Sequence, residues 1–238
     1  ARAIEAACIA ANVPYRFIGG MKLLETAHVK DLISLLRVIA NPMDDIAWMR
    51  FLTLWPGVGD VGASRLAQKL LQASDIDEVF SILEGFGKIP LQALLIMKQM
   101  HMIRHEVQHC VSLGIQALEQ QLSDNYKKDW HKRQGDFELV KQLAIKHHQL
   151  SEFLEEYVLD PVSISEIERQ SDTDVVTLIT IHSAKGTEQK VCYVANVSAG
   201  QYPHARAQGD FDQIEEERRV LYVALTRAQN ELILTKQN

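Results

Sequence analysis

The spacing of apolar residues along the chain changes from a helical pattern to short strand-like runs, and this change divides the sequence into regions. Residues 1–12 have an amphipathic helical pattern, and a strand-like run at 14–18 ends at Gly19 and Gly20. Apolar positions then recur every three or four residues, which predicts helices at 25–40, 44–54, 63–72, 75–83, 90–121 and 134–157. Strand patterns return at 175–181, 191–197 and 231–235.

A long helical block therefore interrupts a region that mixes strands and helices. We expect an α/β fold into which an all-α domain is inserted, because such an insertion produces this order of elements. The expected divisions are residues 1–20 for the first part of the α/β domain, 21–171 for the insert and 172–238 for the second part.

Two phrases near the C-terminal end indicate chemistry. The β-branched run that starts at Val175 stops at small and polar residues, as a buried parallel strand does where it delivers a loop to a ligand. A second phrase, Glu216–Ala228, begins with charged residues and contains Arg227 close to its end. Arginine clamps phosphoryl oxygens well because its planar fork is always charged. Together the phrases predict one half of a nucleotide site.

Composition limits the possible partners. The net charge of −6 excludes a generic binder of polyanions, so contact with nucleic acid must rest on local groups. No apolar segment has the length needed to cross a bilayer. The three cysteines are far apart and odd in number, which favours reduced thiols and a cytoplasmic location. The chain starts without methionine and in mid-helix, which indicates a piece of a longer protein.

Several phrases in order resemble the UvrD/Rep/PcrA family of superfamily 1 DNA helicases. Val176–Glu188 resembles the family's motif V, T-x-H-x-A-K-G-L-E-F, and Glu216–Ala228 resembles motif VI, E-R-R-L-x-Y-V-A-x-T-R-A. Between them, Gly200–His204 matches a G-x-x-P-H segment. Residues 14–20, 29–31 and 40–45 match the passage that leads into the family's accessory domain. These landmarks are colinear and span nearly the whole chain.

The resemblance implies an incomplete RecA-like, P-loop NTPase-like second motor domain, split by an all-α accessory domain. It implies ATP with Mg²⁺ as cofactor, the metal being held mainly by a first RecA-like domain that lies outside this chain and acts in cis. The implied partners are single-stranded DNA, the junction of single and double strands, and accessory repair proteins. The implied activity is ATP-driven translocation on single-stranded DNA with unwinding of duplex, in DNA repair or replication restart.

The resemblance also assigns roles to individual residues. Arg227 would be the arginine finger that stabilises charge on the γ-phosphate. The expected ATP-binding residues are Lys185, Gly186, Glu188, Arg218 and Arg219. The expected DNA-binding residues are Thr180, His182, His204 and the Gly57-Val58-Gly59 turn. Without the surrounding motif, we would favour Arg227 as a cation at the end of a helix that faces solvent or pairs with Glu231. The two arginines of the charged run could pair with Glu216 and Glu217 or only face solvent.

Two departures from the family pattern matter. Thr187 and Gln189 stand where the family has two apolar residues. No G-x-x-x-x-G-K-[ST] loop occurs, so we expect this chain alone to hydrolyse no ATP.

Other functions remain as alternatives. Within the same fold the chain could belong to a helicase-nuclease that acts in recombination, or to a DNA-binding module without catalysis. His105-Glu106-Val107-Gln108-His109 satisfies H-E-x-x-H, the zinc-protease pattern, but lacks the glycine that continues it in metzincins. We therefore expect no metal site and treat a zinc hydrolase as the weakest alternative.

Overall fold

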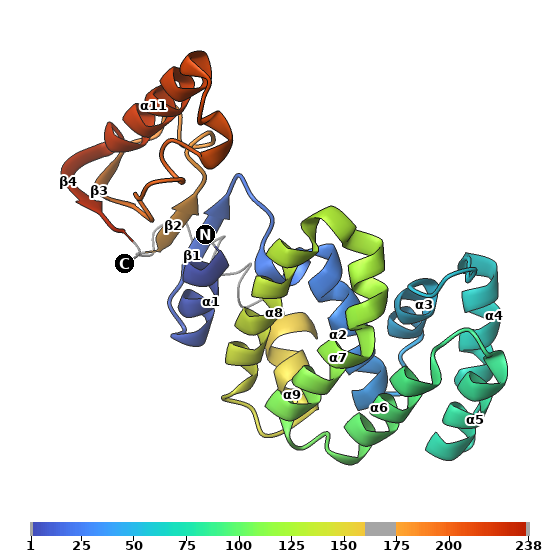
Figure 1. Ribbon diagram of the computed structural model, residues 1–238. Helices are drawn as coiled ribbons and strands as arrows, with labels where there is room; N and C mark the ends of the chain where they lie inside the picture. The colour runs from blue at the N-terminus through green and yellow to red at the C-terminus, as the bar shows by residue number, and fades with distance from the viewer. Residues whose placement is uncertain (1, 160–174, 237–238) are drawn as a thin grey trace. The chain divides into compact units, whose positions relative to one another are not determined.

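The computed structural model describes residues 2–159 and 175–236, which form two compact units. The helical unit contains Arg2–Tyr15 and the described residues from Met21 to Val175. The α/β unit contains Arg16–Gly20 and the described residues from Val176 onward. Figure 1 shows the helices and strands of both units.

The helical unit consists of short and medium helices joined by tight turns. Its α-helices are α1 (Arg2–Ala10), α2 (Ala27–Ala40), α3 (Asp45–Thr53), α4 (Asp60–Leu70), α5 (Ile76–Phe86), α6 (Leu91–Met102), α7 (Val107–Tyr126), α8 (Trp130–Ala144) and α9 (Leu150–Leu154). Two 3₁₀ turns, η1 (Leu23–Glu25) and η2 (Lys127–Asp129), and a π-helical turn, η3 (Glu155–Leu159), lie between or after them. Aspartate side chains cap the N-termini of α3 and α5: the Asp44 carboxylate accepts from Ala47 N at 3.0 Å, and the Asp75 carboxylate accepts from Glu78 N at 2.8 Å.

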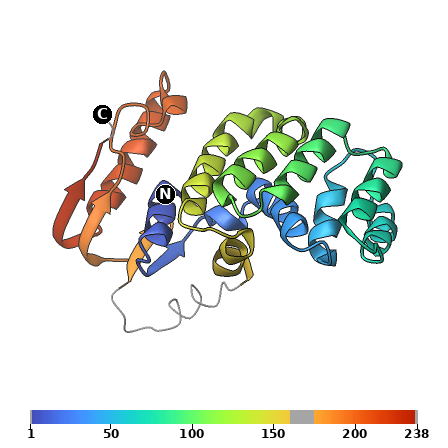
Figure 2. The same cartoon turned by 90° about the horizontal axis from the view of Figure 1, so that it is seen from below.

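Helix α2 is the centre of this unit and packs against α3, α6, α7, α8 and α9 (Figures 1 and 2). Its apolar residues at helical spacing, Val29, Leu32, Leu35 and Leu36, have no exposed surface. Helix α7 approaches α2 closely at Gly114, where an added Cβ would lie 2.9 Å from Leu32 Cδ1. The core of the unit is therefore built around the apolar face of α2, which the spacing of apolar residues in the sequence already shows.

The structure corrects two predicted helices. The single helix predicted over 90–121 is two helices, α6 and α7, separated by residues 103–106. The chain reverses there, which brings Cys110 Sγ within 3.8 Å of the Met100 carbonyl. The helix predicted over 134–157 ends at Ala144 and resumes at Leu150. Neither break contains glycine or proline, so the tertiary packing, rather than a local signal, ends these helices.

Helix α1 packs with the helices, although the sequence led us to expect it in the α/β domain. Arg2 forms an ion pair with Asp136 of α8, and Lys146 donates to the Ala10 carbonyl. Glu5 is buried, and its carboxylate accepts from Leu23 N at 2.9 Å. The chain thus passes from the helical unit into the α/β unit between Tyr15 and Arg16, and it returns to the helical unit at Met21. The expected boundary at 171–172 lies outside the described residues.

The described part of the α/β unit contains two pairs of strands. Strand β1 (Tyr15–Ile18) pairs with β2 (Val176–Ile179), and β3 (Gln189–Val194) pairs in parallel with β4 (Ala228–Leu234). A short 3₁₀ turn, η4 (Ala205–Ala207), precedes helix α11 (Phe211–Leu225), which connects β3 to β4 (Figure 1). The parallel register joins Val194 to Leu234. This β–α–β connection confirms the mixed α/β class.

Large apolar side chains of the α/β unit remain exposed. Tyr193 on β3, Tyr222 on α11 and Leu234 on β4 are 69%, 67% and 52% exposed. Neighbouring residues along a strand point to opposite faces, and β3 and β4 are apolar at successive positions. Such strands are typical of a parallel sheet that is covered on both faces.

Candidate functional site

The loop after β2 forms a compact turn at the end of that strand. The Thr180 carbonyl accepts from Ser183 N and Ala184 N, both at 3.0 Å. The Thr180 hydroxyl donates to Ser183 Oγ at 3.0 Å. Gly186 has a positive φ of 84°, which lets the chain turn back toward β3. Thr180 is therefore held in place, whereas His182 is exposed.

Thr187 stabilises the turn at the position where the family has an apolar residue. Its backbone N–H donates to the Ala184 carbonyl at 3.1 Å, and its hydroxyl donates to the same carbonyl at 2.8 Å. At this departure from the family pattern, the Thr187 hydroxyl therefore supplies a hydrogen bond that closes the loop.

Arg227 lies just beyond α11 and binds the same loop. Its Nε donates to the Val223 carbonyl at 2.9 Å, one terminal nitrogen donates to the Thr187 carbonyl at 3.0 Å, and the other donates to Thr226 Oγ1 at 3.0 Å. The backbone adds a fourth link, since Gln189 N donates to the Arg227 carbonyl at 3.0 Å. The guanidinium therefore has carbonyl and hydroxyl partners, and the ion pair with Glu231 that the sequence left open is not among them.

Glu188 lies beside this arginine at the start of the β3–β4 pair. Gln229 Nε2 donates to Glu188 Oε2 at 3.1 Å, and both side chains are exposed. The parallel pairing joins Gln189 to Ala228, so the two motifs run side by side here. The structure thus brings together Glu188 and Arg227, which are 39 positions apart in the sequence. Lys185 and Gly186 belong to the same loop and are exposed.

The two arginines in the charged run of α11 pair with acids one turn away. Arg218 contacts Glu215 at 2.9 Å and Arg219 contacts Glu216 at 3.0 Å. Both arginine side chains are more than 70% exposed, so these pairs contribute little to stability. Their guanidinium groups therefore face solvent, whereas Arg227 binds the loop after β2.

Glu217 has a different role from its acidic neighbours. Its carboxylate accepts from His204 N at 3.1 Å and so connects α11 to the Gly200–His204 loop. The His204 ring accepts from Arg206 N at 3.2 Å, and Gly200 has a positive φ of 85°. Burial, with a smaller contribution from the Glu217 carboxylate, raises the pKa of Tyr202. Glu217 therefore positions the loop that contains His204.

The Gly57-Val58-Gly59 turn joins α3 to α4 in the helical unit. Gly57 has a φ of 75°, and Gly59 is the N-terminal cap residue of α4. Val58 is buried and its N–H donates to the Trp55 carbonyl at 3.1 Å, so it anchors the turn. An added Cβ at Gly59 would meet no atom within 4 Å, whereas Lys88 Nζ lies near Gly57. The two glycines thus form an open backbone surface.

The H-E-x-x-H pattern does not lie on one helix. His105 and Glu106 precede α7, and only His109 belongs to that helix. Glu106 contacts His105 at 3.8 Å and His109 at 3.3 Å. His101, four residues before His105, has its Nε2 at 3.2 Å from Arg104 NH1. Burial, followed by the Arg104 charge, lowers the pKa of His101. Within the described ranges no group of three or more His, Cys, Asp or Glu side chains could hold a metal.

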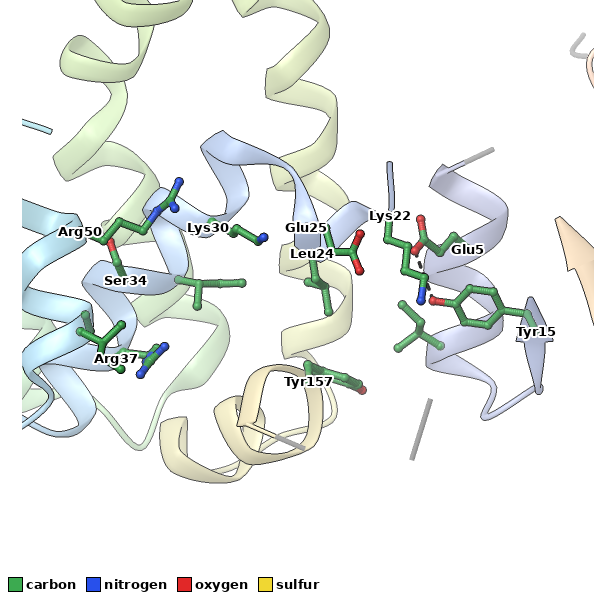
Figure 3. Close-up of a pocket in the computed structure, with 14 residues that line it drawn as sticks. Glu5, Tyr15, Lys22, Leu24, Glu25, Lys30, Ser34, Arg37, Arg50 and Tyr157 are labelled. Carbon is green, nitrogen blue, oxygen red and sulfur yellow. Dashed lines mark hydrogen bonds between the residues drawn. The ribbon is translucent and has the colours of Figure 1, made fainter. Parts of the chain in front are cut away.

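The helical unit has a pocket of about 500 Å³ beside α2 (Figure 3). Its lining includes four basic residues, but Arg37 pairs with Asp44 and Arg50 pairs with Asp31. Glu5 lies at one end, where its carboxylate accepts from Tyr15 Oη at 3.2 Å. The two guanidinium groups of the lining are therefore already paired with carboxylates.

Some residues that shape the site were missed by sequence reasoning. Gln229 and Ser183 have no motif signal that separates them from other polar surface residues, whereas Glu217 opens the E-R-R phrase but was assigned no role beyond an ion pair. Gly19 had a signal, since it ends a strand with a glycine pair, but its contact with the Thr180 turn depends on residues 160 positions away.

Comparison with known proteins supplies the family. The model of the UvrD-like helicase C-terminal domain matches residues 1–128 and 97–238, which together cover the chain. The chain is 28% identical, over 98% of its length, to the ATP-dependent DNA helicase PcrA of Staphylococcus epidermidis, and 27% identical, also over 98%, to PcrA of Bacillus subtilis. A probable DNA helicase II homolog of Mycoplasma capricolum is 27% identical over 94% of the chain.

The aligned region is 35%, 34% and 33% of these three relatives, so the chain spans about a third of their length. No helix in the described part of the chain combines the length and apolar character that crossing a bilayer requires. The match to the family model extends over both the helical and the α/β units. The chain therefore belongs to the family of UvrD-like helicase C-terminal domains.

Proposed function

We propose that this chain is the C-terminal part of the motor of an ATP-dependent DNA helicase that translocates on single-stranded DNA and unwinds duplex. One observation carries the proposal: Arg227 donates to the loop that contains Glu188, and both lie where β3 and β4 begin. An arginine beside a carboxylate and a glycine loop is suited to closing over a nucleotide. The names of the relatives, which describe ATP-dependent DNA helicases, support the same function.

The nucleotide would be ATP with Mg²⁺ in the whole protein. Arg227 would reach the γ-phosphate and stabilise the charge that grows on it during transfer. Glu188 would accept from the ribose, and Gly186 would let the backbone approach the nucleotide. Lys185, Arg218 and Arg219 would add positive charge around the phosphates. The remaining groups, including the metal ligands, would come from a first RecA-like domain in cis.

The fold that we propose is a second RecA-like domain, formed by residues 1–20 and 172–238 and split by an accessory domain at 21–171. The exposed apolar residues on β3, β4 and α11 support it, since a RecA-like domain would cover them with further strands and helices. The packing of α1 argues for assigning residues 2–15 to the helical unit, so that 16–20 are the first part of the α/β domain.

The proposed DNA contacts lie on two surfaces. Thr180, His182 and His204 would contact the backbone of a single strand, because they occupy a strand-end turn and the adjacent loop. Gly57 and Gly59 would present backbone N–H groups to a phosphate of the duplex at the junction, with Lys88 nearby. Val58 would support this turn from the core. Repair or replication restart in the cytoplasm, with accessory repair proteins, is the setting that we propose.

The mechanism follows from the contacts of Arg227. In this structure its guanidinium donates to two carbonyls and one hydroxyl. Closure of the first domain with ATP would provide phosphate oxygens, which bind arginine more strongly than neutral acceptors do. Arg227 would then release the Thr187 carbonyl. The loop from Thr180 to Glu188 would therefore lose one of its contacts when nucleotide binds. Binding of ATP and binding of the strand would thus be coupled through one loop.

A pair of substitutions in the whole protein tests this assignment. Glu188→Ala should raise the KM for ATP by about tenfold, because a hydrogen bond to a charged group is worth about 1.5–3 kcal/mol. It should leave the DNA concentration that half-saturates the ATPase nearly unchanged. His182→Ala should have the opposite pattern. If each substitution changed both constants equally, the separate roles would be wrong. Strand binding without ATPase activity in the wild type would indicate a non-catalytic module.

A further inference from the structure

Gly19 lies against the Thr180 turn so closely that no side chain fits between them. An added Cβ would overlap Ser183 Oγ and would lie 2.5 Å from Ser183 Cβ and 2.6 Å from Thr180 Oγ1. Gly19 also has a φ of 78°, a conformation that L side chains rarely adopt. Both the space and the backbone conformation therefore require glycine here.

The contact belongs to a larger link between β1 and the turn. Thr180 N donates to the Ile18 carbonyl at 3.1 Å, so the residue before Gly19 holds the backbone of the turn. The Thr180 hydroxyl donates to Ser183 Oγ, which places the two side chains together over the face of Gly19. The position of the Thr180 side chain is thus set by a residue that precedes it by 161 positions.

We propose that Gly19 is a positioning residue for strand binding: it sets where the Thr180 hydroxyl and the neighbouring His182 meet the nucleic-acid backbone. The inference rests on the proposed function, since it assumes that this turn contacts a strand. A turn displaced by about 1 Å can weaken a positioned interaction by up to about a hundredfold. Gly19 should therefore affect DNA binding more than it affects nucleotide binding, although it contacts neither ligand.

Other glycines of the α/β unit provide matched controls for the same chemical change. Gly20 is adjacent, but its added Cβ would meet only the tip of the Phe17 ring, which can move. Gly209 has a φ of 92° with no atom within 4 Å of an added Cβ, so Gly209→Ala measures backbone strain alone. A loss seen in Gly19→Ala but in neither control is due to the contact with the turn.

The experiment measures two constants in the whole protein that contains this chain: the half-saturating concentration of an oligo(dT) strand in the ATPase reaction, and the KM for ATP. Gly19→Ala should raise the first by about 10- to 100-fold and leave the second nearly unchanged. Gly20→Ala and Gly209→Ala should change neither by more than about threefold, which corresponds to a change in binding free energy of under about 1 kcal/mol.

A second substitution tests the contact itself. Ser183→Gly removes the two Ser183 atoms that the new Cβ would meet, so Gly19→Ala with Ser183→Gly should recover part of the lost DNA affinity. If Gly19→Ala fails to fold, Ser183→Val approaches Gly19 from the other side without changing its backbone and should weaken strand binding in the same way.

Three outcomes would overturn the inference. Gly19→Ala could behave like Gly209→Ala, it could change the KM for ATP as much as the DNA constant, or the double variant could show no recovery. Failure of the proposed function looks different. In that case the wild type itself would neither hydrolyse ATP with DNA nor bind oligo(dT) by fluorescence anisotropy, and the inference would fall with it.

Discussion

Replacing Arg227 by alanine in the whole protein is expected to lower kcat for DNA-stimulated ATP hydrolysis by about 10³-fold or more while the KM for ATP changes little. The reason is that an arginine finger acts on charge that develops in the transition state and contributes about 10³–10⁵ in rate. A factor of 10³ corresponds to about 4 kcal/mol of lost transition-state stabilisation. Loss of ground-state binding would instead raise KM.

The structure gives the size of the competing structural effect. Arg227 makes three hydrogen bonds from a half-buried position. At about 1 kcal/mol each, their loss would destabilise the α/β unit by about 3 kcal/mol at most. That cost would appear in thermal denaturation rather than in kcat. Arg227→Lys separates the effects further: it keeps the charge but lacks the fork that reaches three acceptors, so its kcat should fall nearly as far.

The assay is steady-state ATPase activity at saturating single-stranded DNA, with the melting temperature of each variant measured in parallel. Arg206→Ala is the matched control, because Arg206 is an exposed arginine of the same unit outside the cluster. It should leave kcat and melting temperature unchanged. Near-normal kcat in Arg227→Ala, with a lowered melting temperature, would refute the catalytic role and assign Arg227 to closing the loop after β2.

Four further predictions concern the chain itself. The purified 238-residue chain should hydrolyse no ATP, with or without DNA; measurable DNA-stimulated turnover would contradict a half-site. Gly114→Leu should lower the free energy of unfolding by about 1–3 kcal/mol, because it overpacks the contact with Leu32; an unchanged denaturant midpoint would mean that α7 shifts without cost. Burial raises the pKa of Glu5, so its contribution to stability is present below the unfolded pKa of about 4.3 and is lost as pH rises through the folded pKa. Glu5→Gln should flatten this pH dependence of the free energy of unfolding and stabilise the chain at pH 7. If the free energy of unfolding of variant and wild type changed in parallel with pH, this reasoning would be contradicted. Burial raises the pKa of Cys110 to about 12, so at pH 8 iodoacetamide should label half-exposed Cys192 and spare Cys110, and equal labelling would show that the core opens readily.

The order of elements and the family were available from the sequence. Helical spacing around Leu32 and Leu36 predicted α2 and its buried face, because a face repeats with a local period that needs no distant partner. The motifs around Glu188 and Arg227 were equally local. Their colinear order identified the family, which the match to the family model over the whole chain confirmed.

Element boundaries and partners required the tertiary structure. The break between α6 and α7 has no glycine or proline, and the helices end there because they pack against each other and α2. Arg227 bonds to carbonyls rather than to Glu231, although both partners were plausible from the sequence. Only the assembled β3–β4 pair brings Thr187 within reach of its guanidinium.

The same distinction explains Gly19 and Glu217. A glycine pair at the end of a strand predicts a turn, but the Ser183 and Thr180 side chains that exclude a Cβ there come from the other end of the chain. The E-R-R phrase identifies Glu217 as a motif residue, but the sequence does not show that its carboxylate accepts from the His204 backbone. Local spacing determines which residues share a face of one element. Which residues meet across elements depends on how segments far apart in the chain pack together. A local sequence pattern carries no information on that packing.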